Sequence, residues 1–149
     1  MNWDNHICRA KDLNGHWREG YYVRHEKRQP CVIGGDELKD DEVEHYIFFD
    51  GFADWNMPRE LKAIEVNPDT VCMYSGMTDK HGKRIFENDV VKKRTYMGIK
   101  PCQVYFSNGC FHCGYGGGSS TATHPYLLDD KNIEVIGNVF DNPMALEGK

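Results

Sequence analysis

The sequence predicts a mainly β protein (β-rich α+β), with a small SH3-like barrel in the C-terminal half and a β-rich N-terminal extension. Three observations lead to this fold class. Runs of aromatic and β-branched residues are short, and polar segments with glycine or asparagine separate them. Two such segments follow each other closely within residues 75–92, and Asn108-Gly109 separates two further runs. Short strands joined by tight turns are typical of small, strongly bent β-barrels.

Residues 75–92 are the stretch around which the predicted fold is organised. The first chain reversal is expected from Asp79 to Gly82, because Gly82 can adopt a positive φ without steric cost. The second is expected at Asn88, since asparagine tolerates a left-handed backbone better than other residues with a Cβ. A strand should then begin at Asp89. We therefore interpret Asp79, Gly82, Asn88 and Asp89 as residues of structural turns.

The rest of the C-terminal half also reads as strands. Asn108-Gly109 between residues 102–107 and 110–113 is the strongest hairpin signal of the chain. Residues 114–120 are rich in glycine and serine, which predicts a surface loop without the order of a phosphate-binding loop. Residues 133–140 are expected to form the closing strand.

The N-terminal half is predicted to be a β-rich region. Residues 7–23 read as strand, turn and strand, with Asn14-Gly15 favouring a tight hairpin. Residues 45–49 are continuously apolar, which predicts a strand buried on both faces, under an oligomer contact, or at an edge that pairs between subunits. A loop with two large aromatics follows at 52–58, and then a strand at 61–66.

The break at Asn67-Pro68-Asp69 marks a boundary between two subregions of one compact unit. The first subregion is the β-rich region 1–66, and the second is the barrel region 67–149.

Charge argues against a general nucleic-acid binder, because such domains are usually strongly basic. The chain of 149 residues has a net charge of −5 and a pI of about 5.8. Residues 1–70 contain nine Lys/Arg and fifteen Asp/Glu, a net charge of −6, whereas residues 71–149 contain nine and eight, a net of +1. Much of the acidic charge lies in residues 36–44, which read as a solvated loop.

The sequence shows no apolar run long enough for a membrane helix and no signal peptide. We therefore expect no membrane partner and a location in the reducing cytosol, where the six cysteines would remain thiols.

Three groups of residues are candidates for chemistry. Cys110 and Cys113 have the spacing of zinc sites and redox dithiols, although Cys102 and His124 would have to complete a set of four ligands. Such a metal-binding protein or metal-dependent enzyme is the third-ranked hypothesis, and no cofactor is expected by default. The second group combines carboxylates and a histidine: Asp79, His81, Glu87 and Asp89. Turn geometry explains its carboxylates without catalysis, so no catalytic residue is assigned and we expect no enzyme.

The third group is basic. Its members are Lys83, Arg84, Lys92, Lys93 and Arg94, with Lys80 and Lys100 as neighbours in the sequence. A barrel that gathers them on one face could contact phosphates, and a nucleic-acid-binding regulatory barrel is therefore the principal alternative function. A solvated surface of lysines is the competing interpretation, because the whole chain is acidic.

The run from Tyr74 to Val91 resembles the signature of the YopX family of phage and prophage proteins. In the family, Asp-Lys-Asn-Gly and Glu-Gly-Asp-Ile-Val stretches stand where this chain has residues 79–82 and 87–91, with Asn88 replacing a glycine. Residues 66–71 and 133–143 resemble the family's lead-in and closing strand, so the similarity is good from about Ile64 to Leu146. The family has no settled activity.

The resemblance implies a small accessory protein of a phage or prophage, in the cytoplasm of the bacterial host. We expect it to act by binding an unknown host or phage protein, with homo-oligomers as a further possibility.

Overall fold

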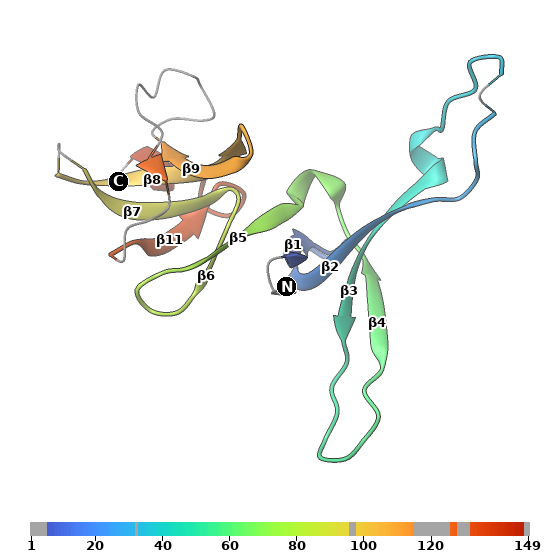
Figure 1. Ribbon diagram of the computed structural model, residues 1–149, viewed down its shortest axis with the longest axis horizontal. Coiled ribbons are helices and arrows are strands. Elements are labelled where there is room, and N and C mark those ends of the chain that lie inside the picture. The colour runs from blue at the N-terminus through green and yellow to red at the C-terminus, as the bar shows by residue number, and fades with distance from the viewer. Residues whose placement is uncertain (1–5, 32, 96–97, 115–125, 128–131, 148–149) are drawn as a thin grey trace. The chain divides into compact units, whose positions relative to one another are not determined.

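The computed structural model describes residues 6–31, 33–95, 98–114, 126–127 and 132–147 (Figure 1). The chain is mainly β, with antiparallel strands and only short 3-10 helices among the described residues. It divides into two compact units, His6–Val71 and the part from Cys72 onward. The sequence places the boundary at residue 67, whereas the division follows Val71, after the 3-10 helix Pro68–Thr70.

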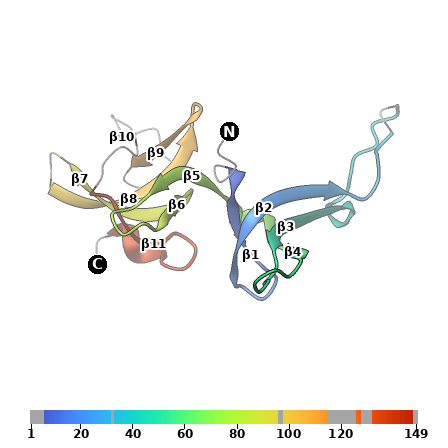
Figure 2. The ribbon, with the colours of Figure 1, turned by 60° about the horizontal axis from the view of Figure 1, so that its bottom comes forward.

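The N-terminal unit is an antiparallel meander with the strand order β4-β3-β2-β1. Its strands are β1 (Cys8–Lys11), β2 (Trp17–Glu26), β3 (Val43–Asp50) and β4 (Leu61–Glu65). Figure 2 shows β2 and β3 running side by side, with Tyr22 opposite Ile47 in their ladder. The small core consists of Ala10, Ile47 and Val66, against which Tyr22 and Ile64 pack.

Burial of β3 on both faces, one of the sequence predictions, is wrong for this unit. Ile47 is fully buried, whereas Tyr46 and Phe48 on the other face are only half-buried. Strand alternation explains the difference, because neighbouring side chains point to opposite faces and only one face meets the core. An edge position for β3 is wrong as well, since β2 and β4 pair with it on either side.

The β1–β2 turn is wider than the tight Asn-Gly hairpin expected from the sequence. The last strand pair is Lys11 with Trp17, so the chain reverses over residues 12–16. The carboxylate of Asp12 accepts hydrogen bonds from the backbone N–H groups of Asn14 and His16, both at 2.9 Å. These bonds, chiefly that of His16, and the Arg18 guanidinium lower the pKa of Asp12, although burial opposes them. A buried carboxylate therefore organises this turn.

The C-terminal unit contains the hairpin β5–β6 and a five-stranded antiparallel sheet of order β10-β9-β8-β7-β11. The strands are β5 (Cys72–Thr78), β6 (Arg84–Phe86), β7 (Asp89–Thr95), β8 (Gly98–Ser107), β9 (Cys110–Gly114), β10 (Tyr126–Leu127) and β11 (Glu134–Asn138). A 3-10 helix, Pro143–Glu147, follows β11.

One cluster forms the core of this unit. The buried residues are Ile85, Val91, Cys102, Val104, Cys113 and Ile133. Neither sheet closes on itself among the described residues, so the SH3-like barrel predicted from the sequence is not confirmed.

Two turns of the C-terminal unit lie within residues 75–92, where the sequence predicts them. Gly82 has a φ of +80°, and its N–H bonds to the carbonyl of Asp79 at 2.9 Å. Asn88 has a φ of 63°, its N–H bonds to Val104 O at 2.8 Å, and its carbonyl accepts from the N–H of Val139 at 3.0 Å. The fully buried carboxylate of Asp89 accepts the N–H of Phe86 at 2.8 Å. Gly82 and Asn88 therefore supply the left-handed backbone of the two turns, and Asp79 and Asp89 accept backbone hydrogen bonds within them.

The Gly20→Ala variant tests the packing of β2 on β3. An added Cβ would lie 2.1 Å from the backbone oxygen of Phe48, which cannot move away without breaking the ladder. We expect a loss of about 1–3 kcal/mol in the free energy of unfolding, as for other overpacked sites. Urea unfolding followed by tryptophan fluorescence measures it, because all three tryptophans precede residue 72.

Gly51→Ala is the matched control, since its added Cβ would approach the movable Lys62 Cε at 3.0 Å and a backbone oxygen at 3.2 Å. Equal stability of the Gly20→Ala variant and the native protein would contradict the packing.

The Asp79→Asn variant tests the charged turn of the C-terminal unit. Although burial opposes ionisation, the N–H groups of Val135, Lys83 and His81 lower the pKa of Asp79. A lowered pKa means that the stability from this carboxylate is present above its unfolded pKa of about 3.9 and is lost as pH falls through the folded pKa. We expect Asp79→Asn to cost about 1–3 kcal/mol at neutral pH, and the difference from the native protein to shrink at pH values near 3.

Urea unfolding followed by far-UV circular dichroism at both pH values measures the cost of Asp79→Asn. Glu60→Gln, an exposed carboxylate, is the control. A pH-independent difference would show that the charge of Asp79 is not what stabilises the turn.

Candidate functional site

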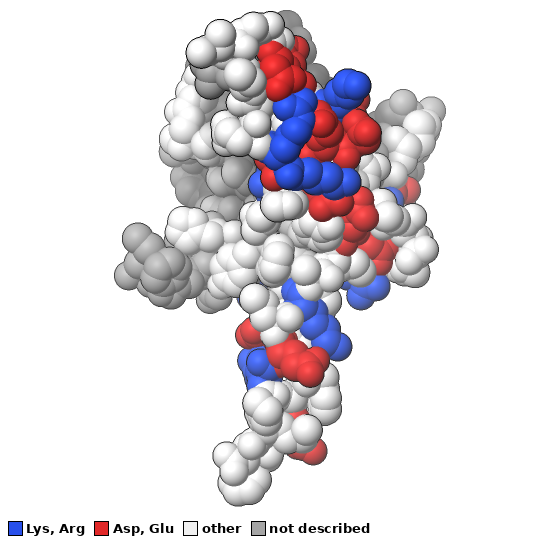
Figure 3. Space-filling view, turned by 90° about the vertical axis from the view of Figure 1, so that its right-hand side faces the viewer, with Lys and Arg blue, Asp and Glu red and all other residues white. Residues whose placement is uncertain are grey.

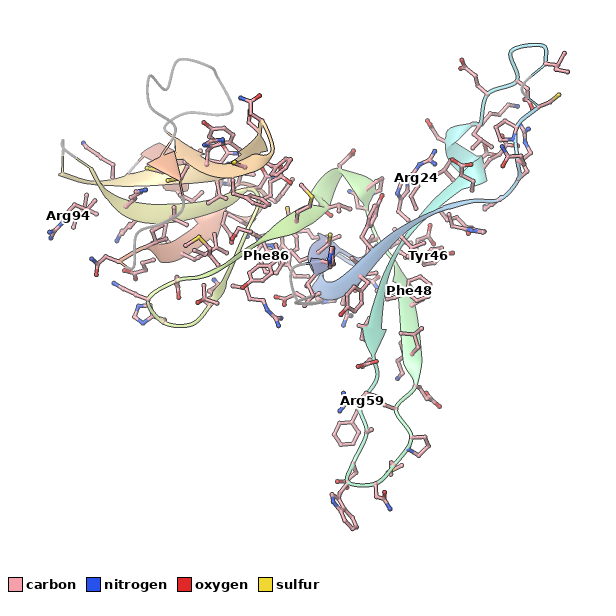
Figure 4. All side chains as sticks on the ribbon, viewed as in Figure 1. Arg24, Tyr46, Phe48, Arg59, Phe86 and Arg94 are labelled. Atoms are coloured by element: carbon pink, nitrogen blue, oxygen red, sulfur yellow. The ribbon has the colours of Figure 1, made fainter. Side chains whose placement is uncertain are left out.

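The structure does not bring the five predicted nucleic-acid-binding residues onto one face. Lys92 and Arg94 are exposed on one side of β7, and Lys93 between them points to the opposite side and is only 5% exposed. Lys83 is exposed in the β5–β6 turn, and the guanidinium of Arg84 lies 5.8 Å from the centre of the Tyr74 ring. Figure 4 shows Arg94 at the far end of β7.

Acidic groups accompany the neighbouring basic residues. Lys80 Nζ is 2.6 Å from an oxygen of Glu134, and Lys92 lies directly opposite Glu134 in the β7–β11 ladder. The ammonium of Lys80 is the main cause of the lowered pKa of Glu134. The basic group is therefore partly neutralised within its own unit.

The two candidate metal ligands lie on opposite faces of β9. Cys110 is exposed and opposite Ser107, whereas Cys113 is fully buried, opposite Val104, in the same core cluster as Cys102. His124 lies outside the described residues. Within the described ranges, no group of three or more His, Cys, Asp or Glu side chains could hold a metal ion.

The carboxylates of the signature stretch bond to the backbone. Asp79 accepts N–H groups of His81 at 2.8 Å, Lys83 at 2.9 Å and Val135 at 3.1 Å. The ring of His81 is exposed on the surface, 4.0 Å from Glu134. Both carboxylate oxygens of Asp79 therefore accept backbone N–H groups, and Oδ2 of Asp89 accepts the N–H of Phe86.

The most exposed apolar side chains lie in a segment that the sequence analysis identifies only as a loop. This is the β3–β4 loop, residues 51–60. Phe52 is 92% exposed, Trp55 91% and Met57 61%, and Leu61 at the start of β4 is 68% exposed. In Figure 3 the lowest part of the molecule, where this hairpin ends, is mostly free of charged side chains. The β3–β4 loop is therefore the candidate binding site of the N-terminal unit.

Local hydrogen bonds shape the loop without covering its aromatic rings. The N–H of Gly51 bonds to Glu60 O at 2.7 Å and closes the base of the loop. At its tip, the N–H of Met57 bonds to Asp54 O at 3.1 Å, and the N–H of Trp55 bonds to the Asp54 carboxylate at 2.7 Å. Asn56 between them has a φ of 61°. A loop with such internal bonds loses less conformational entropy when it binds.

The exposed face of the sheet extends this apolar surface. Tyr21 stands opposite Phe48 and Val23 opposite Tyr46, so all four side chains lie on the face that does not meet the core. Tyr21 is 45% exposed and Val23 41% exposed. Figure 4 shows Tyr46 and Phe48 on the same side of β3, and their rings meet edge to face at 6.3 Å.

Ion pairs hold the acidic segment beside β2 and β3. The guanidinium of Arg28 bonds to Asp36 and Glu42, each at 2.6 Å, and lowers the pKa of Asp36 to about 2. Lys27 bonds to Glu44 at 2.9 Å and lowers the pKa of that carboxyl. These carboxylates remain ionised at neutral pH, which suits structural ion pairs better than a proton donor.

Each unit also carries a groove. The groove of the N-terminal unit has a volume of about 900 Å³, and its lining mixes Lys11, Arg24 and Lys39 with Asp12, Glu65 and Asp69. The groove of the C-terminal unit has a volume of about 730 Å³. Most of its lining residues are apolar, and the polar ones are Lys92, Lys100, Asp141 and Asn142. The lining comes from β7, β8, β11 and the segment 141–145. We call this second one the β8 groove.

No helix of the described residues has the length and apolar character needed to cross a membrane.

One solved structure is similar to this chain over most of its length. The chain is similar to protein EF1440 from Enterococcus faecalis, known from a crystal structure, at 18% sequence identity. The similarity covers 94% of this chain and 96% of that chain, with a TM-score of 0.46. A search of the curated proteins found no match.

The family model for the YopX protein matches residues 9–147. This match begins far before residue 64, from which the motif resemblance is good, and so includes most of the N-terminal unit. Because it spans nearly the whole chain, the chain belongs to the YopX protein family.

Proposed function

We propose that this chain is a non-enzymatic accessory protein of a phage or prophage that acts by binding another protein. Its principal anchor is the β3–β4 loop, because Trp55 and Phe52 are almost fully exposed there. Burying one such ring removes about 150–250 Å² from water. At about 25 cal/mol per Å², this contributes roughly 4–6 kcal/mol per ring before the costs of association.

The exposed sheet face supports the same proposal. Trp, Tyr and Phe are enriched at the centres of protein interfaces, and large exposed apolar patches mark interaction sites. The loop anchors therefore have a neighbouring surface, including Tyr21 and Phe48, that a partner can cover as the loop is bound.

Charge supports a protein partner in preference to a nucleic acid at this site. Asp54 lies at the tip of the loop, and Asp50, Arg59 and Glu60 lie at its base, so residues 50–60 contain three acidic residues and one basic residue. Arg59 Nη1 is itself 3.5 Å from an oxygen of Asp50. An acidic, aromatic loop repels phosphates but suits an apolar pocket with a neutral or basic rim.

A nucleic-acid-binding role is the second candidate, and Lys92 and Arg94 favour it. Both are exposed on the same side of β7, where they could contact phosphates. The burial of Lys93 and the position of Glu134 opposite Lys92 weaken this candidate. A zinc role is weaker still, because Cys110 and Cys113 point to opposite faces of one strand.

Affinity capture from the bacterial host, with the full chain as bait, tests the proposed function. Replacing Trp55 with alanine should reduce recovery of the captured protein at least about tenfold, as expected for a central aromatic anchor. Phe52→Ala should also reduce it. Both side chains are exposed, so the variants should retain the native circular dichroism spectrum and unfolding midpoint.

Ile33→Ala is the matched control for this capture, because Ile33 is 88% exposed in a different loop of the same unit. Undiminished capture by the Trp55→Ala variant would refute the loop as anchor.

A gel-shift titration tests the second candidate. We expect a shift of double-stranded or single-stranded DNA only at low ionic strength, lost as salt rises to physiological values. The combined variant Lys92→Ala/Arg94→Ala should abolish that weak shift. Tight binding at physiological salt that depends on these two residues would replace protein binding as the favoured function.

A further inference from the structure

We propose that the β8 groove of one copy of this chain receives the β3–β4 loop of a second copy. The inference rests on the proposed function, since it takes the loop as a binding anchor and names its partner. Two surfaces without an assigned occupant carry it: an apolar groove in the C-terminal unit and an apolar loop in the N-terminal unit.

The groove is suited to large apolar side chains. Its apolar lining consists of Ile99, Pro101, Ile136, Pro143, Met144 and Ala145. Ile99 is 63% exposed and Met144 54% exposed, although each belongs to a structured element. The volume of about 730 Å³ lies within the range of sites that enclose small ligands, about 300–1,000 Å³, and can accept several side chains. Methionine and isoleucine provide adaptable contacts for aromatic rings.

The loop, like the groove, exposes apolar side chains. Its anchors Phe52, Trp55 and Met57 project from a narrow hairpin end whose backbone is held by internal hydrogen bonds. A projecting hairpin enters a groove more readily than a flat sheet face does. Trp, Phe and Met are all enriched at protein interfaces, and Trp is one of the residue types that most often dominate binding energy.

Charge is also complementary. The charged residues that line the groove are Lys92, Lys100 and Asp141, two basic and one acidic, a net charge of +1. Lys92 is exposed and stands opposite Pro101 of the same lining, whereas Lys100 stands opposite Lys93 in the ladder. Residues 50–60 carry three acidic residues, Asp50, Asp54 and Glu60, and one basic residue, Arg59, a net charge of −2. The same contrast holds more broadly, since residues 1–70 have a net charge of −6 and residues 71–149 a net of +1. Complementary charges of this kind guide association and set its register.

The loop and the groove are different patches of one chain, so the contact between copies is heterologous, head to tail. Such contacts generate closed rings, or open filaments when the rotation between copies does not close. Each copy in the assembly uses its loop once and its groove once. This property separates the proposal from a symmetric dimer, in which the same patch meets itself.

Analytical ultracentrifugation of the full chain over a range of concentrations tests the proposal. We expect the native protein to associate with rising concentration. The loop variant Trp55→Ala and the groove variant Ile99→Asp should each weaken association at least about tenfold. Ile33→Ala, with its exposed side chain in another loop, should leave association unchanged. Circular dichroism confirms that each variant is folded.

Mixing the two defective variants is the decisive step. The Trp55→Ala chain retains an intact groove, and the Ile99→Asp chain retains an intact loop. An equimolar mixture should therefore form a capped dimer of one copy of each, although neither variant associates alone. If the mixture forms no dimer, the head-to-tail contact is overturned, because that contact needs only one intact loop and one intact groove.

Charge reversal adds a second readout. Lys92→Glu should weaken association, because Lys92 shares its side of the sheet with Ile99 and Pro101 of the groove, and high salt should reduce the difference from the native chain. Lys83→Glu is the matched control, because Lys83 is exposed in the same unit but does not line the groove. Equal effects of both reversals would overturn the role of Lys92.

Two further outcomes overturn the inference. The first is a native chain that stays monomeric at every concentration. The second is tryptophan fluorescence that shows Trp55 to be buried and does not change when the protein is diluted. The second outcome would indicate docking within one chain. If either occurs while Trp55→Ala still abolishes capture of a host protein, this inference fails and the proposed function stands.

Discussion

A buried carboxylate, that of Asp79, is the interaction on which the C-terminal unit depends. One side chain accepts N–H groups from its own turn and from Val135 in β11, so it joins the β5–β6 hairpin to a strand more than fifty residues later. Ile85 lies in β6 of this hairpin and Ile133 directly precedes β11, and both side chains belong to the same core cluster. If the carboxylate were lost, several backbone donors would be left without an acceptor, and each would incur a desolvation cost.

The same device recurs in the N-terminal unit, where Asp12 bonds to Asn14 and His16 across the first turn. In both turns backbone N–H groups favour the ionised form, and burial opposes it, so each pKa falls below its ordinary value. Polar groups of this kind serve backbone geometry. The surfaces that we propose for recognition are mostly apolar. They are the rings of the β3–β4 loop and the lining of the β8 groove.

We propose binding as the function because the polar groups of the turns are used within the fold, whereas aromatic side chains remain exposed. Small cores can support each unit because the turns are specified by side-chain hydrogen bonds, and aromatic residues remain outside those cores. Trp55 contributes nothing to the core of its unit, and exposing it to water is unfavourable unless a partner covers it. Ion pairs such as Arg28 with Asp36 and Glu42 keep the acidic segment folded near the strands without creating a reactive group.

The sequence by itself determined the mainly β class, the positions of the turns and the family. Left-handed backbone at Gly82 and Asn88, and a hairpin at Asn108-Gly109, follow from local steric preferences that a single residue carries. Only the tertiary structure decided which side chains are covered. Lys93 is buried beside exposed Lys92, and Trp55 is exposed although it is aromatic, because burial depends on segments distant in sequence that pack against each strand or leave it open.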